Sequence, residues 1–241
     1  GADTIIRAMV AEIEAQGGSV DCDTEVTRIL HENGKARAVE TADGRQIEAN
    51  KAIIANVAPK ALARLTGTTG NADYDTGLDT FRHAPGTVMI HLALSDLPDW
   101  RAGSELRDYA YVTIAPTLDA MALAYQQPLA GLLPTEPMIV VGQPTAIDPS
   151  RAPAGKHTLW LQVRMVPGEI KGDAAGQIEA TDWDTALAPF AERVLNIVER
   201  HAPDLRNRIL GMRCVSPRDL EADNPNLVGG DQVCGSHHLS Q

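Results

Sequence analysis

The stretch TVMIHLAL (87–94) alternates apolar residues with polar or small ones, and so does TLWLQVRMV (158–166). The alternating apolar residues are Val88, Ile90, Leu92 and Leu94 in the first stretch and Leu159, Leu161, Val163 and Met165 in the second. Successive side chains of a β-strand point to opposite faces of the sheet, so both stretches predict strands that bury one face. These two segments set the fold class.

The segments around them extend the same pattern. YAYVTIAP (109–116) and PMIVVGQP (137–144) predict two further strands, and TLDAMALAYQQ (117–127) and DWDTALAPFAERVLNIVERH (182–201) predict helices. Pro189 conflicts with an unbroken second helix, so we expect it to kink that helix or to mark its start. Together they predict an α+β domain, an antiparallel or mixed sheet covered by helices on one side.

The N-terminal part predicts a different unit. DTIIRAMVAEIEAQ (3–16) has apolar residues at helical spacing and predicts an amphipathic helix. SVDC (19–22) predicts a short strand. Within residues 26–49, Asn33-Gly34 and Asp43-Gly44 are typical of two-residue hairpin turns, which predicts a meander of three antiparallel strands.

The run AIIA (52–55) predicts a buried parallel strand that ends at Asn56, with a helix opening at Pro59. Such a strand needs neighbours on both sides, and SVDC alone is too little sheet, so we expect part of the sheet to lie outside this chain. The Gly/Thr/Asp-rich stretch 66–77 predicts a linker or surface loop. We therefore expect one domain over 1–65, a second over 66–215, and a return segment over 216–241.

Bulk composition excludes several classes of protein. The chain has 241 residues, a formal net charge of −11 and no Lys/Arg cluster, so nucleic acid is not an expected partner. Three scattered cysteines are too few for a disulfide framework, which favours a cytoplasmic location. No apolar stretch approaches the length of about 20 residues that spans a bilayer.

The segment with the most site-like composition is NPNLVGGDQVCGSHHLSQ (224–241). Asp231, Cys234, His237 and His238 are of metal-ligating types, but no CxxC or HExxH spacing supports them, so we predict no metal site. The chain also lacks GxSxG, GxGxxG and GxxxxGK[ST], which leaves no hydrolase elbow and no phosphate-binding loop. His91 is interpreted as a surface or hydrogen-bonded sheet histidine.

Three stretches, in this order and spacing, resemble the phytoene-desaturase-like FAD-dependent oxidoreductases, which include retinol saturase and are more distantly similar to amine oxidases. They are residues 1–62, VVGQPTAIDPSRAPAGKHTLWLQV (140–163) and SPRDLEADNPNLVGGDQVCGSHHLSQ (216–241). The resemblance implies a partial FAD-binding domain with a β-meander, then a substrate domain, then a return to the flavin site. It also implies that the GxGxxG segment and a second FAD-contacting segment lie outside these 241 residues, so that FAD belongs to the full-length protein and this piece alone is inactive and does not retain it.

The resemblance also implies roles for particular residues. It implies that Val26 contacts the adenosine side of FAD through its backbone, and that Ala55 and Asn56 lie near the cofactor. The further residues that it implies near the flavin and the substrate entrance are Gly229, Gly230, Ser236 and His237, of which His237 is the candidate acid or base. Ser240 stands where the family pattern leads us to expect Asp, and His238 where a less polar residue is common.

The activity implied is FAD-dependent dehydrogenation or saturation of a C–C or C–N bond in an apolar, isoprenoid-like substrate, with peripheral membrane contact for substrate access. The alternative is a non-catalytic lipid-binding or protein-interaction module derived from the same fold.

Overall fold

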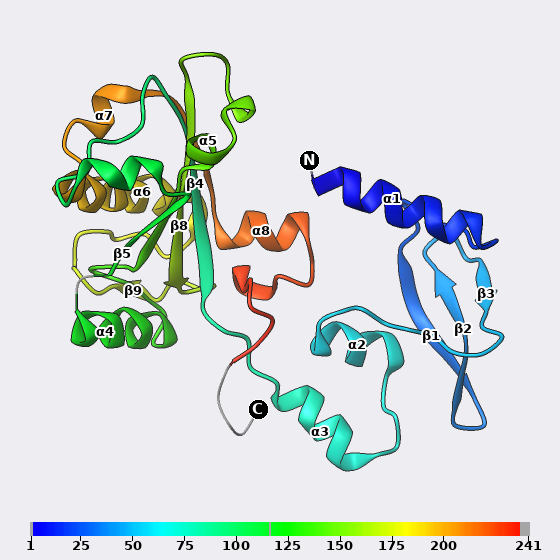
Figure 1. Cartoon of the computed structure of the whole chain (residues 1–241). Helices are drawn as coiled ribbons and strands as arrows, with labels where there is room; N and C mark the ends of the chain where they lie inside the picture. The colour runs from blue at the N-terminus through cyan, green and yellow to red at the C-terminus, as the bar shows by residue number, and fades with distance from the viewer. Residues whose placement is uncertain (1, 116, 237–241) are drawn as a thin grey trace. The chain divides into compact units, whose positions relative to one another are not determined.

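A computed structural model describes residues 2–115 and 117–236 of the chain. It divides into two compact units, one ending at Phe81 and the other beginning at Arg82, which are called the N-terminal unit and the C-terminal unit below (Figure 1). Each unit is described by itself. Within the described ranges, no helix combines the length and the apolar character needed to cross a membrane.

The N-terminal unit contains a helix, a meander and two further helices. These are α1 (Ala2–Ala15), β1 (Val26–Glu32), β2 (Lys35–Thr41), β3 (Gln46–Glu48), α2 (Pro59–Thr66) and α3 (Ala72–Thr80). The three strands pair antiparallel in the order β1-β2-β3, which confirms the predicted meander. Asn33 and Gly34 form the predicted two-residue turn with φ of 51° and 72°, the left-handed values that favour these residue types.

Four predictions for this unit were wrong in detail. Neither 19–22 nor 52–55 is a strand, and Ile54 is 93% exposed. A strand forms only when a neighbour takes up its N–H and C=O groups, and neither segment has a strand neighbour within the described residues. The second hairpin loop spans 42–45 rather than two residues. The expected loop 66–77 becomes helical from Ala72, because the Asn71 side chain caps α3 by accepting a hydrogen bond from the Tyr74 N–H at 3.2 Å.

The C-terminal unit is built on a five-stranded antiparallel sheet in the order β10-β4-β8-β7-β5. Its strands are β4 (Gly86–Leu94), β5 (Tyr111–Ile114), β7 (Ile139–Gly142), β8 (His157–Val166) and β10 (Ile209–Val215), and β6 (Leu132–Leu133) pairs with β9 (Gly172–Asp173) separately. Its α-helices are α4 (Leu118–Leu129), α5 (Pro144–Ile147), α6 (Trp183–His201), α7 (Leu205–Arg208) and α8 (Pro217–Asp223). The α+β class is confirmed, while β10 was not predicted.

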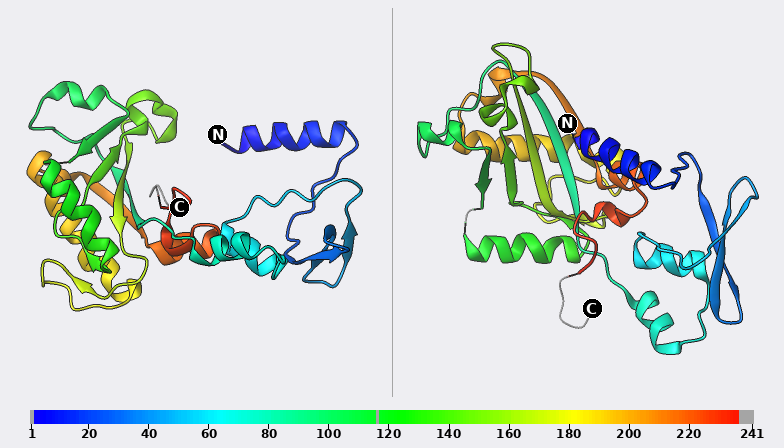
Figure 2. Two further views of the ribbon diagram at one scale, coloured as in Figure 1. Left: turned by 90° about the horizontal axis from the view of Figure 1, so that it is seen from below. Right: turned by 45° about the vertical axis from the view of Figure 1, so that its right-hand side comes forward.

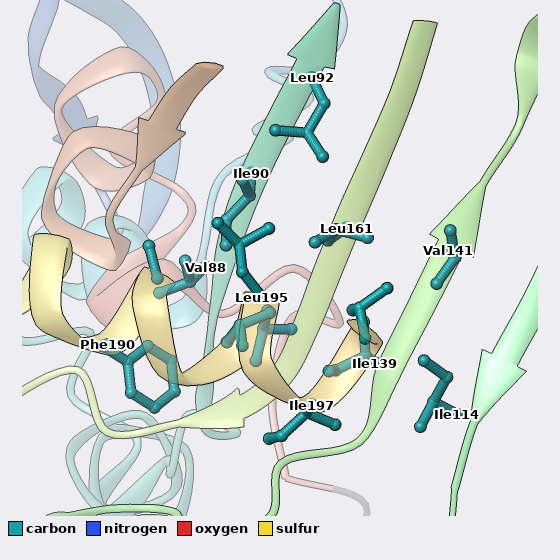
Figure 3. Packing of buried hydrophobic residues seen from close by; sticks show 14 of the residues in the cluster. Val88, Ile90, Leu92, Ile114, Ile139, Val141, Leu161, Phe190, Leu195 and Ile197 are labelled. Carbon is teal, nitrogen blue, oxygen red and sulfur yellow. The ribbon is translucent and has the colours of Figure 1, made fainter. Parts of the chain in front are cut away.

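The core of this unit lies between the sheet and α6, which runs along one face of the sheet in Figures 1 and 2. Ile90 on β4 and Leu161 on β8 are 0% exposed, as is Phe190 on α6, and Figure 3 shows them in one apolar layer with Val88 and Leu195. Burial of this apolar surface is the main force that stabilises the unit. The alternation in β4 and β8 thus directs their apolar residues to α6, as predicted, except at the end of β8. There Val166 is 0% exposed, whereas Met165, expected on the buried face, is half-buried and has a φ of 61°.

Two further predictions for the C-terminal unit need correction. Helix α6 begins at Trp183, six residues before Pro189, so Pro189 does not mark its start. The helix continues through the proline because Asp182 caps its N-terminus and its buried face packs against the core on both sides of Pro189. Helices also do not lie on one side of the sheet only. Residues Leu220 and Asp223 of α8 line a depression together with Met89 and His91, which point away from the core.

Candidate functional site

A buried carboxylate organises the loop that follows η3 (Val228–Gly230). Asp231 is 0% exposed, and its oxygens accept hydrogen bonds from the N–H groups of Ala84, Val233 and Gly235 at 2.8 to 2.9 Å. His83 Nδ1 lies 3.3 Å from the same carboxylate. Burying a carboxylate is costly unless such donors surround it, so these contacts fix the loop 231–235 against the start of β4.

Glycines allow this loop to approach the sheet closely. A Cβ atom at Gly86 would lie 2.2 Å from the Gly229 carbonyl oxygen, and one at Gly168 would lie 2.9 Å from the Gly229 Cα atom. Gly229 and Gly230 themselves have φ of 63° and 76°. Any other residue at 86 would therefore push η3 away from β4.

The predicted cofactor-binding residues of the C-terminal unit are concentrated in this loop. The N–H of Gly229 donates to the Glu221 carboxylate at 2.9 Å, that of Gly230 to the Leu227 carbonyl at 2.8 Å, and that of Ser236 to the Arg82 carbonyl at 2.9 Å. Their N–H groups are thus engaged within the unit. Contact of these residues with a cofactor stays a prediction, and His237, the candidate acid or base, lies outside the described residues.

The other predicted cofactor-binding residues belong to the N-terminal unit. Val26 is half-buried at the start of β1, opposite Thr41, whereas Ala55 and Asn56 are exposed in a segment without regular structure. The predicted contact of Val26 with adenosine, like the contacts of Ala55 and Asn56, stays a prediction. Each unit therefore carries its own share of the predicted site.

The face of the five-stranded sheet opposite α6, here called the open face, carries a row of residues that the sequence did not reveal. Pairing in register places Arg213 opposite His91, His91 opposite Trp160, Trp160 opposite Gly142, and Gly142 opposite Tyr111. This cross-strand row crosses all five strands. It begins with a guanidinium group on β10 and ends with aromatic rings at β8 and β5.

The aromatic end of the row is packed into one surface. The rings of Tyr111 and Trp160 meet edge to face, with centroids 5.5 Å apart and planes at 62°. A Cβ atom at Gly142 would lie 2.1 Å from the Trp160 ring, so the glycine on β7 is what lets the indole lie across that strand toward Tyr111. Edge-to-face pairs of this kind hold large apolar surfaces in a defined orientation.

The other end of the row lies in a depression of about 420 Å³ beside α8. Its lining residues are Met89, His91, Arg213, Val215, Leu220 and Asp223. Partial burial lowers the pKa of His91, and the nearby charge of Arg213 lowers it further. His91 is therefore a neutral imidazole at pH 7, able to donate or accept a hydrogen bond.

One side-chain contact ties the loop after η3 to the open face. The amide of Gln162 donates to the Gln232 side chain at 2.7 Å, and Gln162 lies opposite Met89 in register. Gln232 directly follows Asp231, so the buried carboxylate, the loop and the open face form one continuous structure in the C-terminal unit. We take this structure as the candidate site.

Sequence reasoning missed most of the residues in this row. His91 was interpreted as a surface or hydrogen-bonded sheet histidine. Trp160 could have been found, because the alternation that buries Leu159 and Leu161 directs it to the opposite face. Arg213 was missed because β10 was not predicted. The contact between His83 and Asp231 joins residues 148 positions apart, for which a single sequence carries no signal.

The described residues offer little to a metal or to a phosphate. No group of three or more His, Cys, Asp or Glu side chains is arranged to hold a metal ion anywhere in 2–115 or 117–236. The 241 residues contain no GxGxxG, and the N–H groups of Gly229 and Gly230 are already engaged. This chain therefore does not fit the phosphate-binding part of an FAD site.

Comparison with known proteins shows what the chain is similar to. No protein-family model matches it. It is 27% identical over 211 residues to the neurosporene-forming phytoene desaturase of Cereibacter sphaeroides, covering 87% of this chain and 38% of that protein. It is 24% identical over 256 aligned positions to pyridine nucleotide-disulfide oxidoreductase domain-containing protein 2 of Rattus norvegicus, covering 100% of this chain and 42% of that protein.

Two solved structures are also similar to this chain. An oxidoreductase from Methanosarcina mazei matches 89% of this chain and 42% of its own, with a TM-score of 0.56 and 25% identity. Reduced UDP-galactopyranose mutase matches 86% of this chain and 36% of its own with a TM-score of 0.54, but at 13% identity it shows the fold alone. The chain thus spans well under half the length of these proteins. The resemblance to phytoene-desaturase-like oxidoreductases is confirmed.

Proposed function

We propose that this chain is part of an FAD-dependent oxidoreductase that dehydrogenates or saturates a C–C or C–N bond of an apolar, isoprenoid-like substrate. The supporting observation is that similarity to proteins named phytoene or diapophytoene desaturases extends over 87%, 92% and 100% of the chain in three comparisons. When bound, FAD supplies the hydride chemistry that no amino-acid side chain provides.

In this proposal the C-terminal unit supplies the substrate surface. Trp160 and Tyr111 offer two large rings on the open face, and Met89 adds an adaptable apolar side chain in the depression at the other end of the row. Such a surface binds and orients an apolar molecule and keeps water from it. The phosphates of FAD are held by segments of the whole protein outside these 241 residues.

Access of an apolar substrate from a membrane has a candidate surface on α4. Five large apolar side chains of this helix are exposed: Leu118, Met121, Leu123, Tyr125 and Leu129. Asp119 is its one charged residue. We propose that α4 makes the peripheral membrane contact. We also propose that the protein is otherwise cytoplasmic, since its three cysteines are free. Vesicle flotation of the full-length protein tests this, and a protein that stays with the aqueous fraction contradicts it.

The visible spectrum of the full-length protein tests the main proposal. We expect a yellow protein. For dehydrogenation, its flavin absorbance bleaches under anaerobic conditions on addition of an oxidisable isoprenoid hydrocarbon; for saturation, the reduced flavin regains its absorbance on addition of an unsaturated one. A colourless protein with no GxGxxG segment would contradict the proposal and support the alternative, a non-catalytic lipid-binding or protein-interaction module.

The 241-residue chain by itself gives a sharper form of the same test. Because it has no phosphate-binding loop, we expect it to release added FAD completely during gel filtration. Flavin that co-elutes with this chain in a stoichiometric amount would show that the phosphate site lies within it, and would contradict only the proposal that this site lies outside these 241 residues.

A further inference from the structure

Arg213 differs from most arginines of the C-terminal unit, which have carboxylate partners. Those with partners within 4.0 Å are Arg107, Arg151, Arg193, Arg200, Arg206, Arg208 and Arg218. Among the residues that the structure describes, none forms an ion pair with Arg213, although the chain has a net charge of −11. Its guanidinium group is therefore available to an outside anion.

The surroundings of Arg213 form a small site. It lines the depression of about 420 Å³ whose apolar walls are Met89, Val215 and Leu220. His91 lies directly opposite it in register and is a neutral hydrogen-bonding group at pH 7. Asp223 is the one carboxylate in the lining. A guanidinium with two parallel N–H donors suits a carboxylate. Asp223 repels any anion in this depression, and it repels a doubly charged ligand about twice as strongly as a single carboxylate.

From this charged end, the cross-strand row leads to an apolar end. Trp160 and Tyr111 lie in the same row as Arg213 and His91, with Gly142 between them. Four interstrand spacings separate β10 from β5, which corresponds to about 19 Å. The open face thus offers a cation at one end and aromatic rings at the other, along a line that fits an extended molecule.

We infer that the open face binds an elongated apolar molecule that carries a single carboxylate, which Arg213 binds while Trp160 and Tyr111 contact the apolar chain. This inference rests on the proposed function, because it narrows the substrate class of the same surface. The inferred ligand differs from an unsubstituted hydrocarbon only in its anionic end. The overall charge of −11 repels anions, so a preference for one can arise only from a local site.

Calorimetric titration of the full-length protein with matched probes tests the inference. The probes are dodecanoate, dodecanol and dodecyl phosphate, each below the concentration at which it forms micelles. We expect dodecanoate to bind about tenfold or more tightly than dodecanol, the size of effect given by one hydrogen-bonded charge. Equal binding of the acid and the alcohol would overturn the inference, and tighter binding of the phosphate would overturn the single-carboxylate class.

Variants assign the preference to Arg213. Arg213→Gln should abolish the preference for dodecanoate and leave dodecanol binding unchanged. Arg213→Lys should keep part of this preference, because the positive charge remains but the two parallel N–H donors are lost. Arg101→Gln is the control, an exposed arginine outside the sheet whose removal changes the net charge equally. An equal loss in Arg101→Gln would overturn the assignment to Arg213.

The flavin spectrum of the same samples separates this inference from the proposed function. A yellow protein without a preference for dodecanoate would overturn the inference alone. A colourless protein that keeps the preference, and loses it in Arg213→Gln, would support the carboxylate site and contradict the oxidoreductase.

Discussion

The two units of the chain bury their apolar residues to very different degrees. In the C-terminal unit a continuous core joins the sheet to α6, with Leu161, Val194 and Leu205 each 0% exposed. In the N-terminal unit the described apolar residues that are buried are Ile29, Ala38 and Ala58. Its α1 instead exposes an apolar stripe, with Ile5 at 65% and Met9 at 58%.

This difference shows which unit carries its own stability. A folded unit must offset the loss of chain entropy by burying apolar surface, and only the C-terminal unit does so on a large scale. The N-terminal unit has a meander whose strands pair correctly but bury little. We conclude that the C-terminal unit is the rigid platform on which the open face depends, and the predictions below test that contrast.

The largest expected effect comes from removing core side chains. Leu161→Ala in the C-terminal unit should lower the free energy of unfolding by about 2 to 5 kcal/mol, because it leaves a cavity in a packed core. Ile54→Ala in the N-terminal unit should change it by less than about 0.5 kcal/mol, because Ile54 is 93% exposed. Chemical denaturation of the 241-residue chain measures both, and comparable losses would contradict the contrast.

The next largest effect is on the free energy of unfolding at acid pH. It is tested by comparing two aspartates with similar pKa values, one in each unit. Burial alone would raise the pKa of Asp173, but bidentate hydrogen bonds from Arg193 and N–H groups of the chain outweigh it and hold the pKa at about 2. Hydrogen bonds from Thr41 and Arg45 lower the pKa of Asp43 to about 2 as well. The Asp173 side chain is 1% exposed, whereas that of Asp43 is 55% exposed.

A lowered pKa in the folded state stabilises the fold above the unfolded pKa, and this stabilisation is lost as pH falls through the folded pKa. The C-terminal unit should therefore lose about 2 kcal/mol through Asp173 between roughly pH 4 and pH 2. Asp43→Asn should leave that loss unchanged, because exposed pairs contribute little. Denaturation curves at pH 5 and pH 2.5 test this, and a loss that disappears in Asp43→Asn would be the contrary result.

Helix caps give the smallest effect. Ser216 is buried and forms a capping box with Asp219 at the start of α8, so Ser216→Ala should cost about 1 to 2 kcal/mol. Asn71 caps α3, which has no buried residues, so Asn71→Ala should cost at most about 0.5 kcal/mol. Thermal unfolding compares the two, and an equal cost would show that α3 is as firmly packed as α8.

The same contrast decided how much of the fold the sequence could predict. β4, β8 and α6 were predictable because the C-terminal core imposes a clear period on their residues. The strands expected at 19–22 and 52–55 were wrong because β propensity has no effect without a neighbouring strand. β10 was missed because Gly211 and Arg213 interrupt its apolar residues at the sheet edge.

The candidate site was less predictable than the fold. The glycine pair at 229 and 230 suggested a tight loop, which the structure contains, but not that Gly86 and Gly168 pack against it. The cross-strand row depends on the register of five strands, and a shift of one residue would move each of its side chains to the other face. Register of this kind comes from packing in three dimensions.

The rate at which substrate reduces the flavin of the full-length protein tests the central claim, that the open face of the C-terminal unit binds the substrate. Trp160→Ala should slow anaerobic bleaching about tenfold or more at limiting substrate while flavin content stays unchanged, because the edge-to-face aromatic surface is lost. Tyr74→Ala, which removes an exposed aromatic ring on α3, should leave the rate unchanged. An unchanged rate in Trp160→Ala, with full flavin content, would contradict the account.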